Sequence, residues 1–128
     1  GQDNIRRAAE FYGRIVDRKN VPANFREQAL YSLGRCDELL GDKEKALSRY
    51  HEVIYGYKID AETGTRRSAL WLVKSAFAAV KIYLDKDTPE AAQAAAGVYG
   101  RLIEMNIEPV DDFRKCMNDI YDRYKLKE

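Results

Sequence analysis

The sequence predicts an all-α fold with about six helices. Along most of the chain, apolar residues recur at intervals of three and four positions, which places them on one side of a helix. The chain has only 3 prolines and 8 glycines among its 128 residues, so long regular elements are expected. No useful stretch shows the two-residue alternation of a β-strand. Because the connections are short, sequential helices should pack antiparallel.

The first three helices are predicted from their apolar faces and from the residues at their ends. We expect them over residues 3–18, 23–40 and 43–57. Pro22 separates the first from the second, because proline cannot continue a helix. Gly41 ends the second helix, since glycine accepts the left-handed conformation at a helix C-terminus. Asp42 then caps the third helix. The apolar face of the second helix includes Phe25 and Leu39.

The fourth, fifth and sixth helices are predicted in the same way. They should run from a cap at Thr63 or Thr65 to about Leu84, over 89–105 and over 110–125. Thr88 is a suitable N-cap, with Pro89 at the first helical position. In the fourth helix, Leu70, Trp71 and Phe77 widen the apolar stripe, so we expect this helix to be covered on two sides.

A short block of sequence occurs three times. In each copy an alanine is followed four residues later by a tyrosine and then by aliphatic residues. The three pairs are Ala8 and Tyr12, Ala46 and Tyr50, and Ala95 and Tyr99. Internal repetition of this kind indicates helical pairs joined by loops of variable length.

The middle copy resembles the tetratricopeptide repeat (TPR) family. Leu30, Leu33 and Gly34 stand where that family has an aromatic or leucine residue and a Leu-Gly pair. Ala46 and Tyr50 stand where it has alanine and an aromatic residue. The resemblance implies antiparallel helix-turn-helix repeats stacked in a right-handed α-solenoid. The residues to which it assigns helix packing are Ala8, Tyr12, Leu30, Leu33, Gly34, Ala46, Tyr50, Ala76, Ala95 and Tyr99.

The predicted organisation is a single TPR-like domain over residues 1–128, which we interpret as a fragment of a longer protein. Its parts are a half repeat (1–22), a repeat (23–60), a lengthened repeat (61–106) and a C-terminal capping helix (107–128). The first helix of the lengthened repeat should be about two turns longer than usual. Asp37 and Lys58 depart from the family pattern, which has a tyrosine and a closing proline near these positions.

The predicted function is that of a scaffold that binds a partner protein or peptide. By resemblance, the first helix of each pair lines a concave surface on which the partner lies. Tyrosine, tryptophan and arginine favour such contacts because they combine a large contact area with polar ends. The expected partner-binding residues are Gln28, Tyr31, Arg35, Glu38, Trp71, Lys74 and Phe77. For Trp71 and Phe77, a place in the core is the alternative. For the whole chain, the alternative is a structural module that self-associates through its repeat ends as a homo-oligomer.

Enzymatic, metal-binding and nucleic-acid-binding functions are poorly supported. The only histidine is His51, and its neighbour Glu52 points in another direction on a helix, so the two do not form a site. No common catalytic or metal-binding motif is present, and no cofactor is expected. The net charge of +1 gives no attraction to nucleic acid. The small charged clusters are Arg6-Arg7 with Arg14, Arg66-Arg67 with Lys74, and Asp37, Glu38 and Asp42. We expect them to be surface charges and a cap, and for the two basic clusters the alternative is that they grip an acidic segment.

Cys36 and Cys116 both fall within predicted helices. We expect two small buried apolar residues there, and a disulfide bridge is the alternative. No apolar run approaches the ~20 residues that cross a bilayer, so direct membrane insertion is not expected. Localisation stays open. The stretch Val53-Ile54-Tyr55-Gly56-Tyr57 is similar to repeats in bacterial cell-envelope lipoproteins and their periplasmic helpers, with a cytoplasmic location as the alternative.

Overall fold

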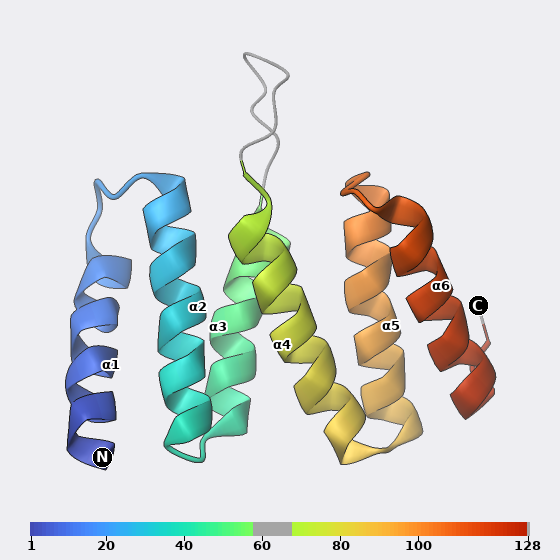
Figure 1. Ribbon diagram of the computed structural model, residues 1–128, viewed down its shortest axis with the longest axis horizontal. Helices are drawn as coiled ribbons and strands as arrows, with labels where there is room; N and C mark the ends of the chain where they lie inside the picture. The colour runs from blue at the N-terminus through green and yellow to red at the C-terminus, as the bar shows by residue number, and fades with distance from the viewer. Residues whose placement is uncertain (58–67, 128) are drawn as a thin grey trace. The chain divides into compact units, whose positions relative to one another are not determined.

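The structure is a computed structural model that describes residues 1–57 and 68–127. The described residues form helices and no strands (Figure 1). The six helices of the described residues are α1 Gln2–Asp17, α2 Ala23–Leu39, α3 Lys43–Gly56, α4 Leu70–Lys86, α5 Pro89–Glu104 and α6 Val110–Tyr124. The prediction of an all-α fold with six helices is confirmed.

The predicted helix ends are formed by the expected local interactions. Gly41 has φ +87, the left-handed conformation that closes α2. Asp42 Oδ1 accepts a hydrogen bond from the Lys45 amide at 3.0 Å at the start of α3. The Thr88 hydroxyl accepts one from the Ala91 amide at 3.2 Å at the start of α5. These caps satisfy backbone groups that have no partner within the helix itself.

The fourth helix differs from the prediction at its start. It begins at Leu70, and Ser68 and Ala69 lie before it without helical structure. Instead of a cap at a threonine, the Ser68 hydroxyl accepts a hydrogen bond from the Leu70 amide at 3.3 Å. With 17 residues, α4 is as long as α2, so the expected two extra turns are wrong for the described residues. Four of the predicted features lie outside the described residues: the candidate caps Thr63 and Thr65, the Arg66-Arg67 pair and Lys58.

The chain divides into two compact units, Gly1–Ser75 and Ala76–Glu128, and α4 begins in the first and ends in the second. In the first unit, α1 packs on α2 and α2 on α3, each running antiparallel to its neighbour (Figure 1). In the second unit, α5 and α6 form an antiparallel pair. Adjacent packing of this kind is consistent with a helical repeat.

The core of the first unit lies along α2. Leu30 and Leu33 are buried against Val16 of α1 and Val53 of α3. Gly34 lies so close to α3 that a Cβ atom there would be 2.5 Å from the Tyr50 ring. Real Cβ contacts are not this short, so the missing side chain allows the close approach.

The core of the second unit combines small and aromatic residues. The buried alanines of α5 are Ala91, Ala92, Ala95 and Ala96. On α6, Phe113 and Ile120 are buried. The Phe113 ring stacks on that of Tyr99, with 6.2 Å between their centroids. Alanine-rich helices approach their neighbours closely, which leaves room for large rings beside them.

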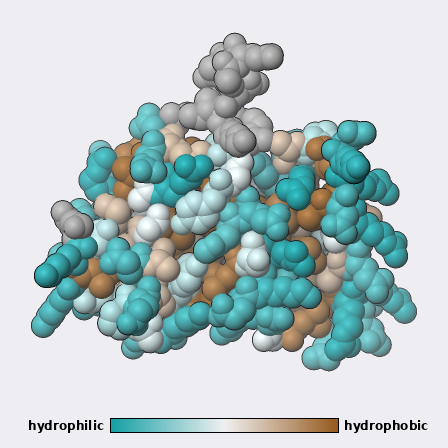
Figure 2. Space-filling view, turned by 180° about the vertical axis from the view of Figure 1, so that it is seen from behind, coloured by the Kyte–Doolittle hydropathy of each residue, from teal (hydrophilic) through white to brown (hydrophobic). Residues whose placement is uncertain are grey.

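Several large apolar residues expected inside the protein are exposed. Phe25 and Leu39 are 56% and 61% exposed. They lie near the two ends of α2, beyond its buried residues, which extend from Glu27 to Asp37. Leu70 and Phe77 are 51% and 48% exposed, so the expectation that α4 is covered on two sides is wrong at these residues, and Phe77 does not take the alternative place in the core. Figure 2 shows hydrophobic side chains in separate patches among hydrophilic ones on the face that it presents. In the described part of the chain, no helix is long and apolar enough to cross a membrane.

Candidate functional site

The seven residues expected to bind a partner come from two helices. Gln28, Tyr31, Arg35 and Glu38 lie on α2 at intervals of three and four, which places them on one side of that helix. Trp71 and Lys74 lie on the part of α4 that belongs to the first unit. Phe77 belongs to the second unit, where its ring centroid is 6.1 Å from that of Phe113. We therefore describe the first six residues together and Phe77 separately.

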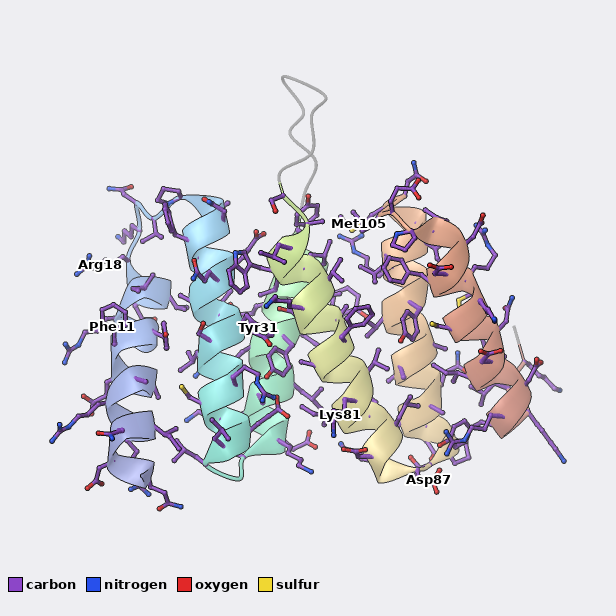
Figure 3. The ribbon with its side chains drawn as sticks, in the orientation of Figure 1. Phe11, Arg18, Tyr31, Lys81, Asp87 and Met105 are labelled. Carbon is purple, nitrogen blue, oxygen red and sulfur yellow. The ribbon has the colours of Figure 1, made fainter. Side chains whose placement is uncertain are left out.

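Tyr31, labelled in Figure 3, is in contact with two other aromatic rings of the first unit. The Tyr31 ring centroid is 5.7 Å from that of Trp71 and 5.9 Å from that of Tyr50. Tyr50 is fully buried, whereas Tyr31 and Trp71 are half-buried. The Tyr31 ring thus rests on a buried ring, the Trp71 ring contacts Tyr31, and both outer rings present part of their surface to solvent.

A lysine lies over the two outer rings. The Lys74 ammonium is 5.5 Å from the centroid of the Trp71 ring and 5.9 Å from that of Tyr31. An ammonium group at this distance is attracted by the electron-rich face of an aromatic ring. Lys74 is exposed and forms no ion pair with the described residues. Its positive charge is therefore accessible next to an aromatic surface.

Beneath these rings, a carboxylate links α2 to α3. The Tyr50 hydroxyl donates a hydrogen bond to Glu38, and the Arg35 guanidinium donates one to the same carboxylate at 2.9 Å. Burial, followed by the hydrogen bond to Glu38, raises the pKa of Tyr50 well above its ordinary value. The side chain of Glu38 is only 16% exposed, whereas that of Arg35 is 47% exposed. Glu38 thus holds the site together, and the expectation that it is a surface charge is wrong.

Asp37 is the residue that sequence reasoning placed least well. It was expected on the surface, but it is only 5% exposed and forms an ion pair with Arg49 of α3 at 3.5 Å. Burial raises the pKa of its carboxyl group, while Arg49 acts in the opposite direction. Because Arg49 lies on another helix, the spacing of residues along α2 does not reveal that Asp37 is buried.

A groove between α1 and α2 was not predicted at all. Its volume is about 460 Å³. The lining residues include Ile5, Ala8 and Tyr12 of α1 and Ser32, Arg35, Cys36 and Leu39 of α2. The helical periodicity of α1 identifies these apolar positions, but it does not reveal whether another helix covers them.

The reactive residue types are dispersed. Both cysteines are free: Cys36 is buried in the first unit and Cys116 is half-buried in the second. Burial raises the pKa of the Cys36 thiol, which makes the reactive thiolate less available. His51 is half-buried, with its ring 5.3 Å from that of Tyr55. Within residues 1–57 and 68–127, no group of three or more His, Cys, Asp or Glu side chains is arranged to hold a metal ion.

A further cavity lies in the second unit. It has a volume of about 230 Å³, and Tyr99, Cys116 and Arg123 are among its lining residues. Burial, followed by its interaction with Cys116, raises the pKa of Tyr99 to about 12. This cavity lies between helices that already pack together and holds no cluster of reactive groups.

Comparisons with protein-family models, with curated proteins and with solved structures gave no match to this chain.

Proposed function

We propose that this chain is a TPR-like helical-repeat scaffold whose α2–α4 surface binds a segment of a partner protein. We define the α2–α4 surface as Gln28, Tyr31, Arg35, Trp71 and Lys74. The observation that carries this proposal is the pair of half-buried rings, Tyr31 and Trp71, with the ammonium of Lys74 over both. Tryptophan, tyrosine and arginine are the residue types that contribute most to binding energy at protein interfaces.

The packing beneath the surface supports the same proposal. The Tyr31 ring rests on the buried Tyr50 ring, and the Tyr50 hydroxyl donates a hydrogen bond to Glu38. A partner that contacts Tyr31 therefore meets a side chain whose position is already restricted. Binding then costs less side-chain entropy than it would at a freely rotating residue.

The charges of this surface favour a partner segment with acidic character. The charge of Glu38 is compensated by Arg35, whereas the charge of Lys74 has no carboxylate partner among the described residues. A carboxylate of the partner can pair with Lys74 while its apolar atoms cover the rings of Tyr31 and Trp71. Complementary charge of this kind mainly affects the rate and specificity of association.

An affinity-capture experiment tests this function. The chain is immobilised, and proteins bound to it are compared with those bound to the Trp71→Ala variant and to the Tyr31→Ala, Arg35→Ala double variant. Phe25→Ala is the matched control, because Phe25 is an aromatic residue of α2 that is 56% exposed outside the α2–α4 surface. We expect partners retained by the wild type and Phe25→Ala to be lost from the other two. Equal capture by all four proteins would rule out the α2–α4 surface.

Self-association is the second candidate function, and the Phe11 ring of α1, which is 58% exposed, is the observation that favours it. Apolar surface left open on a helix is a common site of contact between copies of a protein. Sedimentation velocity over a wide range of protein concentration decides this point. A sedimentation coefficient that stays at the monomer value at every concentration would exclude self-association.

A further inference from the structure

The groove between α1 and α2, hereafter the α1 groove, has the shape of a binding site for a helix. Ile5, Ala8 and Tyr12 follow one another on α1 at intervals of three and four residues. Opposite them, Ser32, Cys36 and Leu39 do the same on α2. Each helix therefore contributes about two turns to a mostly apolar groove, in which Asn4, Ser32 and Arg35 are the polar side chains. Grooves of this kind accept the apolar face of an amphipathic helix.

The repeated alanine and tyrosine differ in burial among the three copies. Ala46 and Tyr50 are both fully buried, and Ala95 and Tyr99 are 0% and 8% exposed. In α1, by contrast, Ala8 and Tyr12 are only half-buried. The Tyr50 hydroxyl bonds to Glu38, whereas the Tyr12 hydroxyl has no hydrogen-bond partner among the described residues. The same sequence block is thus covered in α3 and α5 and open in α1.

The contact between α2 and α3 indicates what would cover it. Gly34 of α2 lies against the Tyr50 ring, where a Cβ atom would be too close. Glu38, one turn further along α2, accepts the hydrogen bond from the Tyr50 hydroxyl. A helix that covers Tyr12 in the same manner therefore needs a glycine and, four residues later, a carboxylate.

We infer that the α1 groove docks an amphipathic helix of a partner protein that carries the pattern Gly-x-x-x-Glu. The glycine of the docked helix lies against the Tyr12 ring, and its glutamate carboxylate accepts a hydrogen bond from the Tyr12 hydroxyl. Arg35 also lines the groove, and its guanidinium, which donates one hydrogen bond to Glu38, has further N–H donors for that carboxylate. The docked helix thereby buries Ala8 and Tyr12 as α2 buries Ala46 and Tyr50.

A second copy of this chain fits the groove less well than a partner helix does. The Gly34 and Glu38 side of α2 is already packed against Tyr50 of α3. A second copy could present this side only by separating its own α2 from α3. The occupant is therefore a helix whose Gly-x-x-x-Glu side is not already used.

A synthetic peptide with the sequence of residues 22–41 is the probe for this inference, because it contains Gly34 and Glu38 in the required arrangement. The peptide carries a fluorescent label, and its anisotropy is followed as the full chain is added. We expect saturable binding that weakens about ten-fold or more when the peptide carries Gly34→Leu, through overpacking against Tyr12. A smaller loss is expected for the peptide with Glu38→Gln.

Variants of the chain show where the peptide binds. Leu39→Arg places a charge in the α1 groove at a residue that is 61% exposed, so it leaves the fold intact. We expect it, like Ala8→Arg, to weaken binding about ten-fold or more. Gln93→Arg adds the same charge at an exposed site on α5 and should not change binding. Trp71→Ala should not change it either, which separates this groove from the α2–α4 surface.

Three results would overturn the inference. The first is the absence of saturable peptide binding, and the second is equal binding to the wild type and Leu39→Arg. The third is a concentration-dependent dimer of the full chain that Leu39→Arg abolishes, since a second copy would then occupy the groove.

Discussion

At the scale of single residues, the contact between Gly34 and Tyr50 has the clearest energetic consequence. Gly34→Ala adds a methyl group that meets the buried Tyr50 ring, and this ring is held by Glu38. We expect the free energy of unfolding to fall by about 1–3 kcal/mol, because overpacked cores are strained. Urea unfolding followed by circular dichroism measures this change.

Gly13→Ala is the matched control for this prediction. Gly13 also lies inside a helix of the first unit, but an added Cβ atom there meets no atom within 4 Å. Alanine is favoured over glycine inside helices by about 0.5–1 kcal/mol, so this variant should be slightly more stable than the wild type. Similar effects of the two substitutions would show that α2 and α3 do not approach as closely as described.

His51 gives a prediction about pH. Burial lowers its pKa below the ordinary value of 6.5, so the unfolded chain binds a proton that the folded chain does not. Stability is therefore complete above pH 6.5 and is lost as the pH falls through the lowered pKa. Between about pH 7.5 and 5.5, the wild type should lose more stability than His51→Gln does. Urea midpoints at both pH values test this, and a smaller loss in the wild type would contradict it.

The sequence predicts some of these positions and not others. The resemblance assigned Gly34 to a close helix contact, because Gly34 stands at the glycine of the Leu-Gly pair. Residue type alone does not make this assignment, since Gly13 is also helical and an added Cβ atom there meets no atom within 4 Å. Asp37 could not be placed, since a charged residue is expected at the surface unless a partner from another helix is known. Its partner, Arg49, lies on α3, and sequence spacing does not reveal this pairing.

At the scale of helices, the start of α3 depends on one side chain. The Asp42 carboxylate accepts a hydrogen bond from the Lys45 amide and places a negative charge near the positive end of the helix dipole. Asp42→Ala should lower the free energy of unfolding by about 1 kcal/mol, whereas Asp42→Asn keeps the hydrogen bond and should lose much less. Thermal and urea unfolding measure both variants. If Asn and Ala cost the same, the side chain of residue 42 does not act as a cap.

Helix periodicity predicts which residues share a side of a helix but not what covers that side. It identified the apolar stripes of all six helices, because core contacts require this spacing. It predicted that the wide apolar stripe of α4 is covered on two sides, yet Phe77 on this stripe is 48% exposed. It also gave no indication that Tyr12 of α1 borders an open groove. Coverage depends on neighbouring helices, which a single helical pattern does not contain.

At the scale of the whole molecule, the candidate surfaces follow from how helices are distributed between the two units. In the first unit, α2 packs against both α1 and α3 and also carries four of the predicted partner-binding residues. One helix therefore supplies the core, the α2–α4 surface and one wall of the α1 groove. Gly34 belongs to the core, Tyr31 to the α2–α4 surface and Cys36 to the groove wall. These neighbouring positions have different roles because each points in a different direction around the helix.

Separate cores lead to a prediction about how the chain unfolds. Where stability is a sum of local interfaces, a substitution weakens its own interface most. Gly34→Ala lies in the unit Gly1–Ser75, so amide protection measured by hydrogen exchange should fall in α1, α2 and α3 more than in α5 and α6. An equal fall in all helices would instead indicate that the two units unfold together. In that case α4, which belongs to both units, transmits the loss of packing at Gly34 to the Ala95 and Phe113 core.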